Sequence, residues 1–155
     1  MTNLWATLYG AGAVVLFALA YATQAFEIIA FVTMVIFLLH HFQDEVLLFG
    51  KERSLVRTLE QLGPVIMYTA ITADALFGSY IALWAAYAVL GLMAIYGVCI
   101  ARFKTYAPDA LSWYFTLISV ALLYVALAGV RADASILAGL LILNHYVCWY
   151  VHFYF

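Results

Sequence analysis

Six apolar stretches, separated by short polar segments, occupy most of this 155-residue chain. They cover roughly residues 4–22, 25–49, 64–78, 81–102, 110–130 and 134–155. A helix needs about 20 apolar residues to cross the hydrocarbon part of a bilayer, and every stretch except the third has about that length. The pattern therefore predicts an all-α integral membrane protein, with a single polytopic domain of about six transmembrane helices.

The composition excludes an ordinary soluble fold. Apolar residues make up 69% of the chain and charged residues 9%, whereas soluble domains are closer to half apolar and a quarter charged. A formal net charge of −2 gives no sign of nucleic-acid binding. The bilayer is therefore the expected partner of most of the surface, and nucleic acid is not.

The basic residues predict the orientation in the membrane. With six spans, the N-terminus and the loops near 50–63 and 102–109 lie on one side, which carries five of the six Lys and Arg residues: Lys51, Arg53, Arg57, Arg102 and Lys104. Only Arg131 lies on the other side. Because basic loops remain in the cytoplasm, we expect a cytoplasmic N-terminus. Aromatic residues near the span ends are interpreted as an ordinary interfacial belt, including Tyr106, Trp113, Tyr114, Trp149 and Tyr150.

The third stretch is the least regular. Pro64 suits the first turn of a helix, so the sequence predicts a helix that begins there, preceded by a polar segment that forms at most a short interfacial helix. This places Asp74 near the middle of a short span. A carboxylate at that depth must be protonated or paired, and we expect a structural hydrogen bond, with Thr69, Thr72 or Ser79 nearby. The sequence Gly78-Ser79-Tyr80 predicts a tight turn.

The second and sixth stretches carry all four histidines of the chain. His40, His41, Asp44 and Glu45 lie in the second, and His145 and His152 in the sixth. With a rise of about 1.5 Å per residue, these side chains fall at similar depths near the cytoplasmic boundary. The spacings also favour a shared face, because residues four or seven apart lie on the same side of a helix. We therefore predict that the two helices present a cluster of imidazoles and carboxylates to one another.

This ligand set suits a metal ion. Imidazole with carboxylate binds iron, zinc or manganese, and a non-haem iron with open positions activates oxygen. The candidate ligands are His40, His41, Asp44, Glu45, His145 and His152, and Asn144 is a candidate to orient an imidazole. The first hypothesis is an integral-membrane oxidoreductase with a non-haem iron site, acting on a lipid, hydrocarbon or isoprenoid substrate.

The second hypothesis is a non-catalytic subunit of a larger membrane complex. His41 and His145 would then bind haem b or a chlorophyll-type pigment, or be purely structural. The last stretch ends at Tyr154-Phe155 without a charged residue, which predicts either that the chain continues beyond Phe155 or that this end packs against another subunit. No HExxH or CxxC motif is present, so the sequence gives no support to a zinc protease or a structural zinc site.

Overall fold

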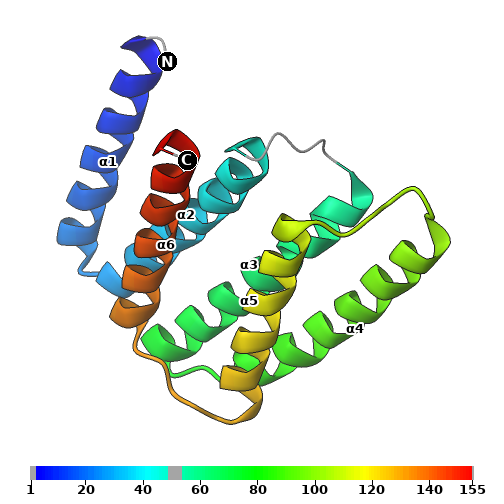
Figure 1. Cartoon of the computed structure of the whole chain (residues 1–155). Coiled ribbons are helices and arrows are strands. Elements are labelled where there is room, and N and C mark those ends of the chain that lie inside the picture. The colour runs from blue at the N-terminus through cyan, green and yellow to red at the C-terminus, as the bar shows by residue number, and fades with distance from the viewer. Residues whose placement is uncertain (1–2, 49–53, 155) are drawn as a thin grey trace.

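Six helices make up the described part of the protein. A computed structural model describes residues 3–48 and 54–154, apart from the side chains of residues 3–6, 8, 9, 47, 148, 151 and 152, and within these ranges there is no strand. The helices follow one another with short connections (Figure 1), and their bounds are α1 Asn3–Thr23, α2 Phe26–Leu48, α3 Leu55–Phe77, α4 Ile81–Arg102, α5 Ala110–Leu127 and α6 Ala134–Tyr154. The prediction of an all-helical chain is confirmed.

Three of these helices are long and apolar enough to cross a membrane. They are residues Phe26–Val46 of α2, all of α4 and all of α5. Helices α1 and α6 contain shorter apolar segments, Gly10–Thr23 and Ala134–Val147. Many large apolar side chains are exposed, such as Phe17 at 73%, which is the surface that a bilayer would cover.

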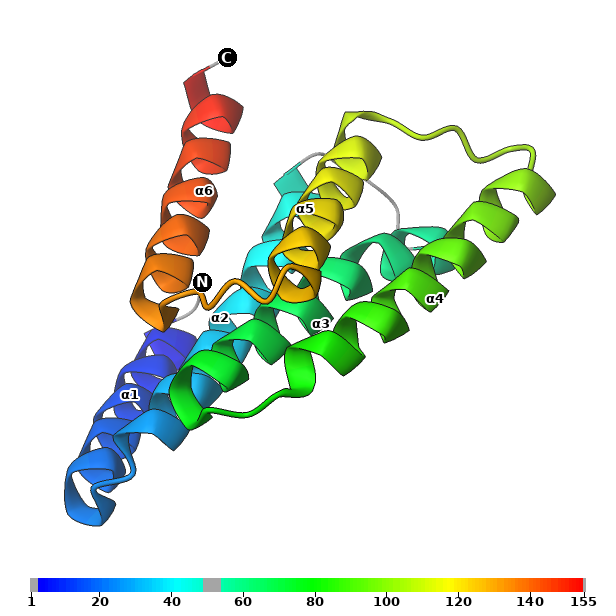
Figure 2. The same ribbon diagram turned by 90° about the horizontal axis from the view of Figure 1, so that it is seen from below.

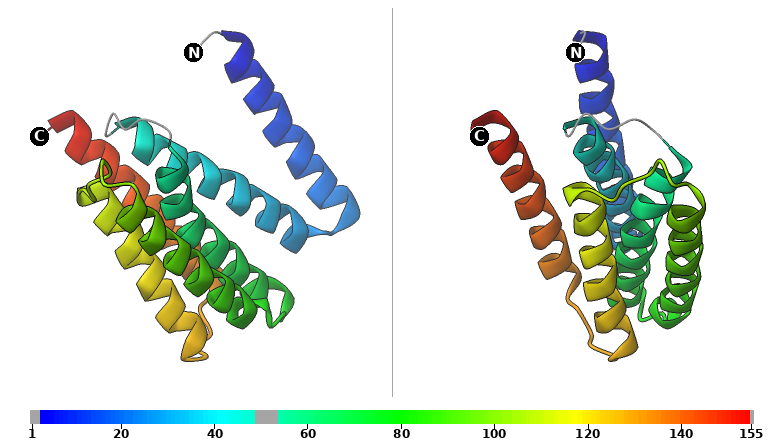
Figure 3. Two further views of the ribbon diagram at one scale, coloured as in Figure 1. Left: turned by 90° about the vertical axis from the view of Figure 1, so that its right-hand side faces the viewer. Right: turned by 45° about the vertical axis from the view of Figure 1, so that its right-hand side comes forward.

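Helix α3 is the centre of the packing. It lies against α2, α4, α5 and α6, whereas α1 packs mainly against α2 and stands apart from the rest (Figures 2 and 3). One apolar cluster joins α3, α4 and α5 around Met67, Val89 and Leu123. A second joins α2, α5 and α6 around Phe42 and Phe115. This second cluster holds α2 and α6 side by side, and these are the two helices that carry the histidines.

The predicted start of the third helix at Pro64 is wrong. Helix α3 begins at Leu55, where the Ser54 hydroxyl caps it by accepting from the Arg57 backbone N–H at 3.1 Å. Pro64 therefore lies inside the helix. The sequence interpretation gave the preceding segment a short interfacial helix of its own. In the structure, Arg57 and Glu60 are buried, and this segment belongs to α3 from Leu55 onward.

The earlier start of α3 also corrects the depth of Asp74. This residue lies in the last turn of the helix, rather than near its middle. Its carboxylate accepts from Ser79 Oγ at 2.5 Å and from the backbone N–H groups of Ile81 and Ala82 at 2.9 and 3.1 Å. Asp74 therefore caps the start of α4, so the predicted structural hydrogen bond and its partner Ser79 are both confirmed. Gly78, at φ 61°, makes the predicted turn.

Candidate functional site

Two histidines from different helices meet in the interior. The Nδ1 atoms of His41 on α2 and His145 on α6 lie 3.1 Å apart. His41 has no exposed surface. The aromatic ring of Phe37, one turn earlier on α2, stacks on the His41 imidazole and meets His145 edge-on. The pairing of these helices at this depth agrees with the expectation from helix rise and spacing.

A polar chain continues from the far side of His41. The Asn144 amide nitrogen lies 3.3 Å from His41 Nε2 and also donates to the Tyr114 hydroxyl on α5. Asn144 therefore lies beside the His41 ring, on the side away from His145. This is the position from which the sequence analysis expected it to orient an imidazole. Tyr114 was interpreted as part of an aromatic belt, and only the packing of α5 against α6 reveals its contact.

Of the two predicted carboxylate ligands on α2, Glu45 is buried and Asp44 lies nearer the surface. Glu45 is 1% exposed, and its Oε1 lies 4.0 Å from His41 Nδ1. Asp44 instead pairs with His40, with Oδ2 and Nε2 3.2 Å apart, and the His40 side chain is 61% exposed. The His40 ring is still near His145, at a centroid distance of 6.2 Å. The structure therefore brings together His41, His145 and Glu45, and leaves His40 and Asp44 on the outer side.

Five of the six predicted metal ligands have described side chains, and these five do not form a complete site. Among the described residues, no group of three or more His, Cys, Asp and Glu side chains is close enough to hold a metal ion. The His152 side chain lies outside the described part of the chain. The geometry gives a histidine pair, of which His41 is buried and His145 is partly exposed, with a buried carboxylate beside it.

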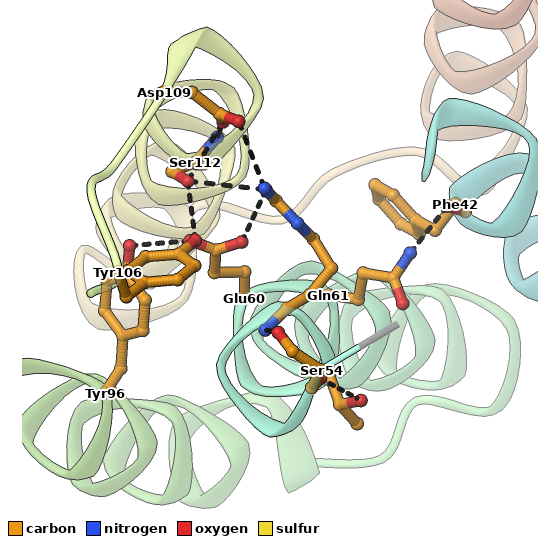
Figure 4. Close-up of polar contacts among 10 residues, drawn as sticks. Phe42, Ser54, Glu60, Gln61, Tyr96, Tyr106, Asp109 and Ser112 are labelled. Atoms are coloured by element: carbon orange, nitrogen blue, oxygen red, sulfur yellow. Dashed lines mark hydrogen bonds and ion pairs between the residues drawn. The ribbon is translucent and has the colours of Figure 1, made fainter. Parts of the chain in front are cut away.

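A second buried polar cluster was not predicted. Arg57 lies between two carboxylates, with Nη1 2.6 Å from Glu60 Oε2 and Nη2 3.2 Å from Asp109 Oδ2. Figure 4 shows that side chains from α3, α4 and the α4–α5 loop converge here. Glu60 accepts from the hydroxyls of Tyr96, at 2.7 Å, and of Tyr106.

This second cluster fastens the α4–α5 loop to the helices. Tyr106 Oη also lies 2.8 Å from Ser112 Oγ, and Asp109 caps α5 by accepting from the Ser112 backbone N–H at 3.0 Å. Burial, together with the hydrogen bond to Glu60, raises the pKa of Tyr106. The sequence signal was the pair Arg57 and Glu60, three residues apart on one helix face.

In its described part, the chain is a helical protein with three membrane-length apolar helices and a histidine pair of which His41 is buried. The chain matches no known protein family, no curated protein and no solved structure. Any statement of function therefore depends on the site itself.

Proposed function

We propose that this chain is an integral membrane protein that binds a transition-metal ion between His41 and His145. Three helices of membrane-crossing length and the large exposed apolar surface support membrane insertion. The distribution of Lys and Arg supports an orientation with the N-terminus and the histidine pair on the cytoplasmic side. Ionisable groups held inside a membrane protein are candidates for function, and the pair of buried His41 with His145 is such a group.

The distance between the two Nδ1 atoms carries the proposal. Metal–nitrogen bonds are about 2.0–2.1 Å long, so two nitrogens at adjacent positions on one metal lie roughly 2.9–3.4 Å apart. The observed 3.1 Å falls in this range. A metal ion would take the place of the proton that the two imidazoles share, and rotation of the Asn144 amide would let its oxygen accept from His41 Nε2–H.

Glu45 is the proposed carboxylate ligand. It is buried 4.0 Å from His41 Nδ1, so a change of side-chain rotamer is enough to bring it to a shared ion. Two histidines and one carboxylate leave open positions on iron, and this ligand set belongs to the non-haem iron oxygenases. His152, two turns after His145, is the further ligand that the spacing predicts.

The surroundings favour an oxidoreductase that acts on an apolar substrate. Bound iron would supply oxygen activation, and the exposed apolar side chains of α2 and α6, among them Leu39 and Leu143, would face the lipid phase from which the substrate would come. We therefore propose a lipid, hydrocarbon or isoprenoid substrate. The aromatic ring of Phe37 and the buried position of His41 would keep water away from the reacting groups.

A haem or chlorophyll-type pigment fits this geometry less well. Axial nitrogens on opposite sides of one haem iron lie about 4 Å apart with the macrocycle between them. Here the two rings meet directly, with their centroids 5.3 Å apart and their planes at 66°. A subunit with a pigment between these histidines would require α2 and α6 to separate.

The test is metal content and absorption of the purified protein in mild detergent, compared among three variants. His41→Ala and His145→Ala remove the proposed ligands. His40→Ala is the matched control, since it removes a neighbouring histidine that is exposed and paired with Asp44. We expect one iron per chain without a haem or pigment band, lost in the first two variants and retained in the control.

Three results would contradict the proposal. A strong haem or pigment band would support the subunit hypothesis instead. Absence of any metal from the protein after it has been incubated with Fe²⁺ and Zn²⁺ would leave the histidine pair as a structural hydrogen bond. Equal metal loss in all three variants would show that the pair is not the binding centre.

A further inference from the structure

A cavity of about 510 Å³ shares no lining residue with the histidine pair. It is formed where α3 turns into α4 and where α5 leads into α6, and both connections lie at the lower end of the molecule in Figure 1. Its volume is within the range of about 300–1,000 Å³ that is usual for ligand pockets. The loop between α4 and α5 lies at the opposite end. The cavity is therefore separate from both polar clusters described above.

The cavity contains one cation and one carboxylate. Arg131, which lies in the α5–α6 loop, lines it and makes no ion pair with any described residue. Asp74 lines it as well, and its two oxygens accept three hydrogen bonds from Ser79, Ile81 and Ala82. A carboxylate has about four acceptor positions, so one remains, and it lies on Oδ2. The site thus presents a guanidinium to an anion and a carboxylate oxygen to a cation.

The remaining walls are apolar and aromatic. Ile71, Leu83 and Leu127 line the cavity. Trp84 and Tyr80 also line it, and their exposed fractions are 72% and 76%. The cavity lies where α4 begins and α5 ends, and both are membrane-length helices. Ends of spans are at the level of lipid headgroups, where Trp and Tyr are enriched. A ligand here would meet charges at one end and hydrocarbon at the other.

We propose that this cavity binds a phospholipid with a phosphoethanolamine headgroup. The phosphate would pair with Arg131, since guanidinium recognises phosphate oxygens by charge-assisted hydrogen bonds. The primary ammonium would donate to Asp74 Oδ2, and an acyl chain would lie along the apolar wall. A choline headgroup has no N–H to donate to Asp74, and a purely anionic headgroup would place no cation beside that carboxylate. The site therefore selects a zwitterion with a protonated amine.

The experiment measures lipid selectivity in reconstituted vesicles. Phosphatidylethanolamine, phosphatidylcholine or phosphatidylglycerol with brominated acyl chains is mixed into vesicles of the unlabelled lipids, and quenching of tryptophan fluorescence is recorded. The difference between the wild type and Trp84→Phe reports the tryptophan at the cavity. We expect brominated phosphatidylethanolamine to quench at a roughly tenfold lower mole fraction than phosphatidylcholine, the factor that corresponds to one hydrogen bond to a charged group.

Two variants test the two charges separately. Arg131→Gln should weaken quenching by all three lipids, because each of them carries the phosphate, while Arg102→Gln, which removes an exposed arginine at the other end of α4, should retain the wild-type profile. Asp74→Asn should reduce the preference for ethanolamine over choline, and circular dichroism checks that it remains folded. Equal quenching by the three lipids, or an Arg131→Gln profile like the wild type, would overturn the proposal. Full displacement of the lipid by free phosphoethanolamine or inorganic phosphate would show a site for a soluble phosphate compound and would also overturn it.

Discussion

A glycine where α3 packs against α5 offers a direct test of the packing. Gly63 on α3 is buried, and a Cβ added there would lie 2.6 Å from Ser119 Oγ on α5 and 3.5 Å from Ser119 Cβ. The Ser119 hydroxyl donates to the Phe115 carbonyl at 2.8 Å. In Gly63→Ala the hydroxyl must therefore rotate away and lose this buried hydrogen bond, or the helices must move apart.

The expected cost follows from these contacts. An unsatisfied buried hydroxyl costs about 1–3 kcal/mol, and overpacking that shifts helices costs a similar amount. Replacing glycine by alanine inside a helix also gives up to about 1 kcal/mol of helix propensity. Gly97→Ala is the matched control, because Gly97 lies inside α4 and its added Cβ meets nothing within 4 Å. The propensity gain is common to both variants, so their difference of about 1–3 kcal/mol isolates the clash.

The assay is unfolding in mixed micelles of mild detergent and dodecyl sulfate, followed by circular dichroism. The double variant Gly63→Ala/Ser119→Ala should recover most of the loss, because the remaining contact at 3.5 Å is ordinary van der Waals packing. Equal stability of Gly63→Ala and Gly97→Ala would refute the close crossing of α3 and α5. Failure of the double variant to recover would show that the hydroxyl is not the obstacle.

Three further predictions concern the polar groups. Arg57→Met leaves Glu60 buried without its cation and should cost about 3–5 kcal/mol of unfolding free energy, whereas Arg102→Met, at an exposed position, should change little in the same assay. The pKa of Tyr106 is raised above its ordinary value of 10.0, so above pH 10 the folded state keeps a proton that the unfolded state loses. The free energy of unfolding should therefore fall as the pH rises above 10. Unfolding measured from pH 9 to 11 should show a smaller decline in Tyr106→Phe than in the wild type. Asp74→Ala removes the cap of α4 and should cost about 1–2 kcal/mol, and an unchanged unfolding midpoint would contradict that capping role.

The histidine pair illustrates how far spacing on a helix can predict a site. His41 and Glu45 are four residues apart, so they share a face in any α-helix, and a similar depth for His145 follows from counting residues along its helix. Which histidine turns inward is a different matter, because His40 and His41 are adjacent and differ by about 100° around the helix. The packing of α2 against α6 buries His41 and leaves His40 exposed.

Tyr106 and Tyr114 illustrate what spacing leaves open. Both stand near the ends of apolar stretches, where a tyrosine is ordinary in any membrane protein. Their hydroxyls join polar clusters with partners that are distant in sequence, Glu60 for the first and Asn144 for the second. Contacts between distant segments depend on how the helices pack, which no local pattern in the sequence records.

By itself, the sequence determined the helical class, most of the helix bounds and the two helices that carry the histidines, because hydrophobicity and helical periodicity are local properties. Tertiary structure decided the rest. It extended α3 back to Leu55, since Arg57 and Glu60 become acceptable in the interior only when Asp109 and two tyrosine hydroxyls satisfy them. It places Asp74 in the last turn of α3, and it buries His41 while His40 stays exposed. The burial of Arg57 and Glu60 and the burial of His41 both depend on groups that are distant in the sequence, and such contacts exist only after the chain has folded.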